Sequence, residues 1–198
     1  MPISLENKII NKLQDFYKIK TVYPLHEPLI EKDDQKNVIE SVKSTYVSTV
    51  GPLIGKFEFE IAKYCGSKYA VATNSGTSAL HLSLLALGVK KKDEVLVPAF
   101  TFVGTVNSIA YCDAIPHFID SSIEKKGVDV NKLEIYLKRI TVRKGKFIYN
   151  KNTGNRIKAI IPVHIFGHPC EIDKILVLAK KYNLIVLEDA AESLGSRY

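Results

Sequence analysis

The sequence lacks several features that would place it at once in a class of protein. No apolar run approaches the length of a membrane-spanning helix, and the first thirty or so residues lack the apolar core of a signal peptide. Only three cysteines occur in 198 residues, and no two of them form a CxxC pair. These absences predict a cytoplasmic protein with reduced thiols, and argue against a disulfide-bonded frame or a zinc site.

Motifs that bind nucleotides or metals are absent as well. Gly51–Lys56 resembles a phosphate-binding loop, but three residues instead of four separate its glycines, and Phe57 replaces the magnesium-binding hydroxyl. No GxGxxG is present, so a dinucleotide site of the Rossmann type has little support. The histidines of His164–His168 have the spacing of zinc ligands on a helix, but Gly167 and Pro169 exclude that helix. We therefore expect no bound metal.

The composition is that of a globular chain, with one strongly basic segment. Hydrophobic residues make up 46% and charged residues 25%, and 198 residues are enough for one large domain. The formal net charge of +7 suggests a nucleic-acid partner. However, the segment from Lys138 to Lys158 contains eight Lys or Arg and no acid, which accounts for the whole excess. Such a loop is usually solvated, although it could favour an anionic substrate. We expect neither nucleic acid nor a membrane as a partner.

Hydrophobic periodicity predicts a helical N-terminal part and then alternating strands and helices. Residues 1–68 contain an amphipathic helix over 5–16, an extended linker around His26 between Pro24 and Pro28, a second helix over about 32–45 and a break at Gly51–Gly55. From residue 69, strands are predicted over 69–73, 94–98, 115–119, 157–163 and 184–187, and helices over 77–87, 103–111, 130–140 and 172–182. Phe147–Tyr149, the turn residues Asn152–Asn155 and Ile157 predict a β-hairpin insertion. This order predicts an α/β fold with a mostly parallel sheet and helices on both faces.

Three segments that follow predicted strands carry residues suited to a ligand. Asn74–Ser78 places a glycine and hydroxyls at a helix start, where free N–H groups bind phosphate; an ordinary helix cap is the alternative. Val97–Phe102 could offer an aromatic ring to a flat heterocycle, or its phenylalanines could be core residues. Asp189 follows Leu184–Leu187, which predicts a strand buried on both faces. Asp189 could be a functional carboxylate at a strand end, or a helix N-cap with Glu192 as its capping-box partner.

A phosphate loop, an aromatic platform and a buried carboxylate suit a phosphorylated aromatic cofactor that has a basic ring nitrogen. A carboxylate beside that nitrogen raises its pKa and keeps it protonated, so that the ring can act as an electron sink. This combination is typical of pyridoxal 5'-phosphate (PLP) chemistry. His164, at the end of a predicted strand, is a further candidate to line the site, whereas His81 and His117 fit structural roles.

Short segments that match one known family run through most of the chain. They are Val47-Ser48 and Gly51, Phe57-Glu58, Tyr64 with Gly66, Ser75–Leu80, Asp93–Val95, Pro98, Thr101-Phe102, Asn107, Asp120, Pro162–His164 with Gly167, and Glu188–Ala191. On these residues the sequence resembles the DegT/DnrJ/StrS sugar aminotransferases, which are PLP-dependent enzymes of fold type I acting on nucleotide-linked keto sugars.

The resemblance assigns roles to individual residues. It implies that Gly76-Thr77 holds the cofactor phosphate and that Phe100 stacks on the cofactor ring. Asp189 would pair with the pyridine nitrogen. Glu192 falls where the family often has Gln or His near the cofactor's phenolic oxygen, and His164 would line the site.

The resemblance also implies an activity. Residues 24–28, 164–170 and 190–196 and the predicted hairpin look most like the legionaminic-acid branch of the family. Its members aminate C4 of a UDP-linked 4-keto-6-deoxy-N-acetylhexosamine, with glutamate as the amino donor. The implied protein is therefore a homodimeric sugar-nucleotide aminotransferase of surface polysaccharide biosynthesis. The alternatives are a PLP-dependent sugar dehydratase of the same family and a non-catalytic partner protein that keeps the fold.

One departure from the family pattern affects catalysis. The family's Schiff-base lysine follows the aspartate, after a Ser-Phe signature, and none of the lysines present matches that motif. Without it the amino group has no covalent relay. The family's small C-terminal domain is missing too. We therefore expect residues 69–198 to form an incomplete PLP-binding domain, and the 198-residue piece to be inactive and unstable on its own.

Overall fold

The computed structural model describes residues 4–18 and 28–197, and it contains two compact units that meet in sequence at Ala70 and Val71. The first unit holds α1 (Leu5–Tyr17), α2 (Lys32–Lys43) and α3 (Pro52–Cys65), and none of the residues of these helices is buried. The helices predicted over 5–16 and 32–45 are thereby confirmed. No helix in the described ranges combines the length and the apolar character needed to cross a bilayer.

The break predicted at Gly51–Gly55 is wrong, because helix α3 begins there. Gly51 is the extended N-cap residue and Pro52 is the first helical residue, a position at which the N–H that proline lacks has no helical partner anyway. Gly66, with φ of 66°, ends the helix in the left-handed conformation. Proline and glycine therefore mark the two ends of a helix in this segment.

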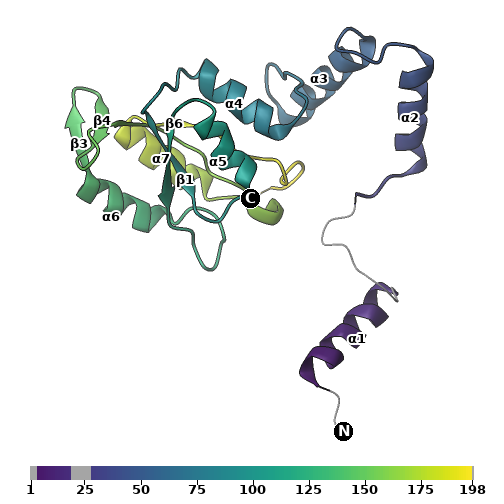
Figure 1. Ribbon diagram of the computed structural model, residues 1–198, viewed down its shortest axis with the longest axis horizontal. Coiled ribbons are helices and arrows are strands. Elements are labelled where there is room, and N and C mark those ends of the chain that lie inside the picture. Colours follow the sequence, from purple (N-terminus) through teal and green to yellow (C-terminus); the bar gives the residue numbers. More distant parts are fainter. Residues whose placement is uncertain (1–3, 19–27, 198) are drawn as a thin grey trace. The chain divides into compact units, whose positions relative to one another are not determined.

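The second unit is built on a six-stranded sheet (Figure 1). Its parallel strands are β1 (Glu94–Pro98), β2 (Ile115–Ile119), β5 (Arg156–Ile160) and β6 (Ile185–Val186). The antiparallel strands are β3 (Thr141–Lys144) and β4 (Phe147–Asn150). The order is β2-β1-β5-β4-β3, with β6 also paired to β5. This is the mostly parallel α/β sheet that the sequence predicts.

Helices cover both faces of the sheet, as the strand pattern shows. The helices of this unit are α4 (Gly76–Ala86), α5 (Val103–Ala110), α6 (Val130–Ile140) and α7 (Ile172–Tyr182). In β1, Val95 and Val97 belong to a core cluster that includes residues of α4 and α5. Leu96, between them, belongs to a second cluster with residues of α6 and α7. Successive side chains of a strand point to opposite faces, so the two helix pairs lie on opposite sides of β1.

Two predicted strands differ from the structure. Residues 69–73 form no strand, because an extended segment needs a neighbour to pair its backbone groups and no described strand pairs with this one. The strand predicted over 184–187 is confined to Ile185–Val186, and its residues are half-buried rather than buried on both faces. It pairs with β5 alone, through Ala159 and Ile160.

The predicted hairpin is confirmed, and a third strand extends it. Strands β4 and β5 are antiparallel, with Ile148 opposite Ile157. The additional strand β3 pairs with β4 across a turn at Gly145, whose φ is 60°. Helix α6 runs directly into β3 at Thr141, so no loop marks the change in the sequence.

Candidate functional site

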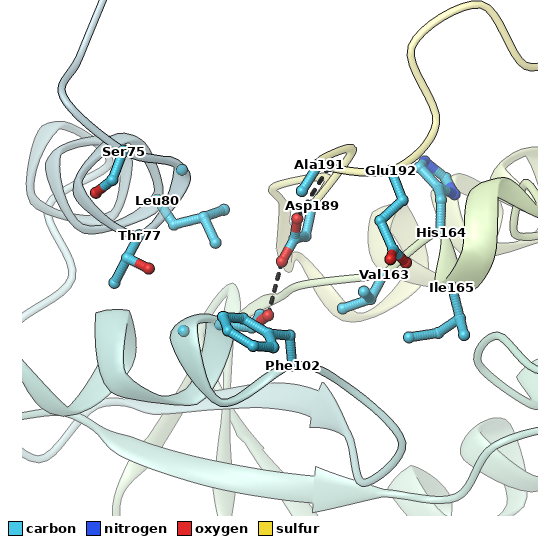
Figure 2. Close-up of a pocket in the computed structure, with 13 residues that line it drawn as sticks. Ser75, Thr77, Leu80, Phe102, Val163, His164, Ile165, Asp189, Ala191 and Glu192 are labelled. Atoms are coloured by element: carbon cyan, nitrogen blue, oxygen red, sulfur yellow. Dashed lines mark hydrogen bonds between the residues drawn. The ribbon is translucent and has the colours of Figure 1, made fainter. Parts of the chain in front are cut away.

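A cavity of about 420 Å³ lies at the carboxyl ends of the parallel strands (Figure 2). Its thirteen lining residues fall in four segments: 75–80 at the start of α4, 102–105 at the start of α5, 163–165 beyond β5 and 189–192 beyond β6. Ligands of open α/β sheets bind at this edge. Five of the six predicted site residues line the cavity, namely Gly76, Thr77, His164, Asp189 and Glu192, whereas Phe100 does not.

The start of α4 offers backbone donors to an anion. The side chain of Ser75 caps the helix by accepting a hydrogen bond from the N–H of Ser78 at 3.2 Å, and the Ala79 N–H donates to the Ser75 carbonyl at 3.0 Å. The N–H groups of Gly76 and Thr77 come before the first helical hydrogen bond and have no partner within the helix. The helix dipole adds partial positive charge at this end, so the two N–H groups suit a phosphate. Ser75 supplies the ordinary cap, and the N–H groups of Gly76 and Thr77 remain candidates for binding an anion.

Asp189 is a buried carboxylate held from two sides. Only 8% of the residue is exposed. Its Oδ2 accepts a hydrogen bond from the Thr105 hydroxyl at 2.6 Å, and its Oδ1 accepts one from the Ala191 N–H at 3.2 Å. Its backbone pairs with the segment beyond β5, since its N–H donates to the Pro162 carbonyl and its carbonyl accepts from the His164 N–H. No helix begins at this point, so the N-cap interpretation is wrong.

His164 is fixed by hydrogen bonds at both ring nitrogens. The Cys170 N–H donates to Nδ1 at 3.0 Å, and Nε2 lies 3.1 Å from Oε2 of Glu188. Because a backbone N–H can only donate, Nδ1 is the acceptor and Nε2 carries the proton that it donates to Glu188. Burial raises the pKa of the Cys170 thiol, which donates to the Val163 carbonyl at 3.1 Å. The two hydrogen bonds of the His164 ring therefore connect the segment beyond β5 to the segment beyond β6, and both segments line the cavity.

The aromatic ring at the cavity is Phe102 rather than the predicted Phe100. The ring of Phe100 packs edge-on against Phe166, with the ring centroids 6.1 Å apart, outside the set of lining residues. Phe102 lines the cavity and is 73% exposed, so a face of its ring is open to a ligand (Figure 2). Glu192 also lines the cavity, and its Oε2 accepts a hydrogen bond from the Phe166 N–H at 2.8 Å.

Gly104 allows the starts of α4 and α5 to approach each other closely. A Cβ at this position would lie 2.6 Å from Oγ1 of Thr77 and 3.1 Å from Cδ1 of Phe102. A side chain at this position would therefore displace the Thr77 hydroxyl or the Phe102 ring, both of which belong to lining residues. The absence of a side chain at Gly104 allows this close approach.

The sequence alone missed several residues that build the site: Ser75, Phe102, Gly104 and Thr105. Phe102 lies in the same loop as the predicted Phe100, and bends at residues 99–101 decide which ring faces the cavity. Thr105 carried no distinguishing signal, because α5 also contains a second hydroxyl at Ser108 and an amide at Asn107. None of the thirteen lining residues, all in the described part of the chain, is a lysine or an arginine.

Comparison with known proteins identifies the family of the chain. The sequence pattern of the DegT/DnrJ/EryC1/StrS aminotransferase family matches residues 28–198. GDP-perosamine synthase of Caulobacter vibrioides is 39% identical over 171 residues, which are 86% of this chain and 42% of that protein. UDP-4-amino-4-deoxy-L-arabinose–oxoglutarate aminotransferase of Shewanella sediminis is 34% identical over 175 residues, 88% of this chain and 41% of that protein.

A solved structure has a similar fold. It is GDP-4-keto-6-deoxymannose-3-dehydratase with a trapped PLP–glutamate geminal diamine, with a TM-score of 0.69 and 28% sequence identity over 89% of this chain and 43% of that one. The chain spans about two fifths of the length of the relatives it matches. Since the family pattern covers most of its length, the chain belongs to the DegT/DnrJ/EryC1/StrS family of PLP-dependent aminotransferases.

Proposed function

We propose that this chain is the cofactor-binding part of a PLP-dependent aminotransferase that transfers an amino group from glutamate to a nucleotide-linked 4-keto-6-deoxy sugar. The observation that carries the proposal is the cavity itself. It combines a buried carboxylate at Asp189 with the open start of α4 and the exposed ring of Phe102. The names of the matched relatives, which include two nucleotide-sugar enzymes, support the substrate class.

The residues present fit PLP in chemistry and in spacing. A Cβ built at Gly76 meets no atom within 4 Å, so there is room for a phosphate against the N–H groups of Gly76 and Thr77. Phe102 offers its open face to the pyridine ring. None of the lining residues is a lysine or an arginine that could pair with the Asp189 carboxylate. Its negative charge is therefore available to a protonated ring nitrogen.

In this proposal each of these residues has one task. When bound, PLP supplies an electron sink for negative charge that develops on the amino acid. Asp189 holds a proton at the ring nitrogen, because a carboxylate in a site of low dielectric raises the pKa of a cationic neighbour. Gly76 and Thr77 anchor the phosphate, and Phe102 covers one face of the ring and excludes water from it.

We infer that the lysine that attaches the cofactor comes from a segment outside these 198 residues. No lysine lines the cavity in the described part of the chain, and the relatives are more than twice as long. Within this function we propose a UDP-linked N-acetylhexosamine of the legionaminic-acid type as substrate, a homodimer as the assembly and the cytoplasm as the location. A GDP-linked sugar, as in the name of the perosamine synthase, is the competing substrate.

A sugar dehydratase is the second candidate. The similarity to GDP-4-keto-6-deoxymannose-3-dehydratase favours it, because the same cavity residues would serve a cofactor that removes oxygen from the sugar instead of adding nitrogen. The two candidates share every residue discussed above. They differ in the residue at the position where the family's aminotransferases have the Schiff-base lysine.

The test is the intact mass of the protein from its native source after borohydride reduction, followed by an assay with glutamate and GDP- or UDP-linked 4-keto-6-deoxy sugars. A species of about twice the mass of this chain, with a phosphopyridoxyl adduct and with transfer of glutamate nitrogen, would support the proposal. Loss of sugar oxygen without nitrogen transfer would support the dehydratase. A protein of this chain's own mass that carries no adduct and transfers no nitrogen would contradict both, and would favour the non-catalytic partner.

A further inference from the structure

We propose that Thr105 is a positioning residue that aims the carboxylate of Asp189 at the ring nitrogen of the cofactor, an inference that rests on the proposed function. Thr105 lies in the first turn of α5, and Asp189 follows β6, far along the chain. The fold nevertheless brings the Thr105 hydroxyl to 2.6 Å from Oδ2 of Asp189. Thr105 is 1% exposed and Asp189 is 8% exposed, so little water competes for this hydrogen bond.

The direction of the hydrogen bonds determines what Thr105 can do. The Thr101 hydroxyl donates to Oγ1 of Thr105 at 3.0 Å, and a carboxylate can only accept. The single proton of the Thr105 hydroxyl is therefore donated to Asp189. The backbone of Thr105 is fixed as well, since its N–H donates to the Phe102 carbonyl and its carbonyl accepts from the Ser108 hydroxyl at 2.7 Å.

The two donors on Asp189 act on different oxygens. Thr105 holds Oδ2, and the Ala191 N–H holds Oδ1 at 3.2 Å. Two hydrogen bonds on opposite oxygens fix the plane of a carboxyl group, which is otherwise free to rotate about its last side-chain bond. Each oxygen can accept a second hydrogen bond, so the group keeps a free acceptor for a ring N–H. Removing the Thr105 hydroxyl would leave one oxygen without its donor and the plane without its second anchor.

A positioning role differs from a packing role in a measurable way. If Thr105 only fills space, its replacement should change the binding of any ligand of the same shape equally. If it aims Asp189 at the ring nitrogen, its replacement should affect only ligands that have that nitrogen. We define the nitrogen preference as the affinity for pyridoxamine 5'-phosphate divided by the affinity for its 1-deaza analogue, in which C–H replaces the ring nitrogen. Pyridoxamine 5'-phosphate is suitable because it has no aldehyde to react with surface lysines.

The experiment measures the nitrogen preference by equilibrium dialysis with the apo form of the full-length protein, of which this chain is proposed to be the cofactor-binding part, and with its variants. We expect T105V, which keeps the shape but lacks the hydroxyl, to lower the preference about tenfold. T105S should retain most of it because it keeps the donor. T101V should lower it about two- to threefold by removing the bond that orients the Thr105 hydroxyl. T141V is the matched control, since Thr141 donates to the Leu137 carbonyl in α6 and does not line the cavity.

The outcomes separate this inference from the function on which it rests. A wild-type chain that does not bind pyridoxamine 5'-phosphate would contradict both the proposed function and the role of Thr105. Binding with a nitrogen preference that T105V leaves unchanged would overturn the role of Thr105 alone. Far-UV circular dichroism checks that each variant is folded. If T105V does not fold, an unchanged preference in T101V would overturn the inference.

Discussion

Replacing Glu94 with glutamine should destabilise the second unit by about 3 kcal/mol at pH 7. Glu94 is 1% exposed and begins β1, beneath the hairpin. Its Oε2 accepts from Nδ1 of His117 at 2.6 Å and from Nδ2 of Asn150 at 2.9 Å. Its Oε1 accepts from the Thr153 hydroxyl and, at 3.5 Å, from Nδ2 of Asn155. The carboxylate thus connects β1 to β2, β4 and the hairpin turn.

The magnitude follows from the number of donors. All four neighbours donate to the carboxylate, whereas the glutamine amide offers one acceptor atom and one donor atom. Whichever way the amide is turned, its N–H₂ group meets the side-chain N–H₂ group of Asn150 or Asn155, and that hydrogen bond is lost. The loss of one hydrogen bond to a charged group costs about 1.5 kcal/mol, and the other three, which become neutral, each weaken by about 0.5 kcal/mol, so the total is about 3 kcal/mol.

The loss should depend on pH with a defined sign. Burial by itself would raise the pKa of the Glu94 carboxyl, but hydrogen bonds from Thr153, Asn150 and His117 and the charge of His117 bring the pKa below its ordinary value of 4.5. The unfolded chain therefore binds this proton more readily than the folded one, and the carboxylate stabilises the fold fully above that ordinary value. This stability is lost as the pH falls through the lower, folded-state pKa. The difference between wild type and E94Q should therefore shrink as the pH falls below 4.5.

The assay is urea unfolding followed by far-UV circular dichroism at pH 7 and at several lower values. The matched control is E134Q, since the Glu134 carboxylate lies at the surface between Lys138 and Lys181 and its loss should have little effect at pH 7. Equal stability of E94Q and wild type at pH 7 would refute the argument. So would a difference that grows as the pH falls.

Three further variants test the core, a helix cap and the aromatic wall. L137A should cost 2–5 kcal/mol in urea unfolding, because Leu137 is fully buried between α6 and the sheet and the replacement leaves a cavity. D129A should lower stability by about 1 kcal/mol, because Oδ1 of Asp129 caps α6 by accepting from the Lys132 N–H at 3.0 Å; an unchanged melting temperature would contradict this. F102A should weaken the binding of pyridoxamine 5'-phosphate about tenfold and F100A should not, and the reverse result in dialysis would restore the stacking role to Phe100.

Much of the fold is predictable from the sequence because its signals are local. The apolar run Glu94–Pro98 and the amphipathic periods of Val130–Ile140 and Ile172–Tyr182 match elements of the structure at both ends. The predictions failed where the presence of a strand depends on pairing with a neighbouring strand. Residues 69–73 have a composition that favours a strand but no paired neighbour among the described residues, and β3 is a strand only because β4 lies beside it. Whether a segment has a neighbouring strand to pair with cannot be determined from the residues of that segment alone.

The candidate site could likewise be predicted where its signals are local. The prediction missed residues whose role depends on contacts with distant parts of the chain. Asp189 and Gly76-Thr77 could be found because each is marked by its own neighbours, a strand end and a helix start. Thr105 could not, since its importance lies in a hydrogen bond to a residue 84 positions away, across β1 and β5. The residues proposed to hold the cofactor therefore carry local signals, whereas the role proposed for Thr105 depends on packing that no local pattern records. On that proposal, a screen by sequence pattern would pass over a change at Thr105 in a relative and would retain a protein whose carboxylate is present but wrongly aimed.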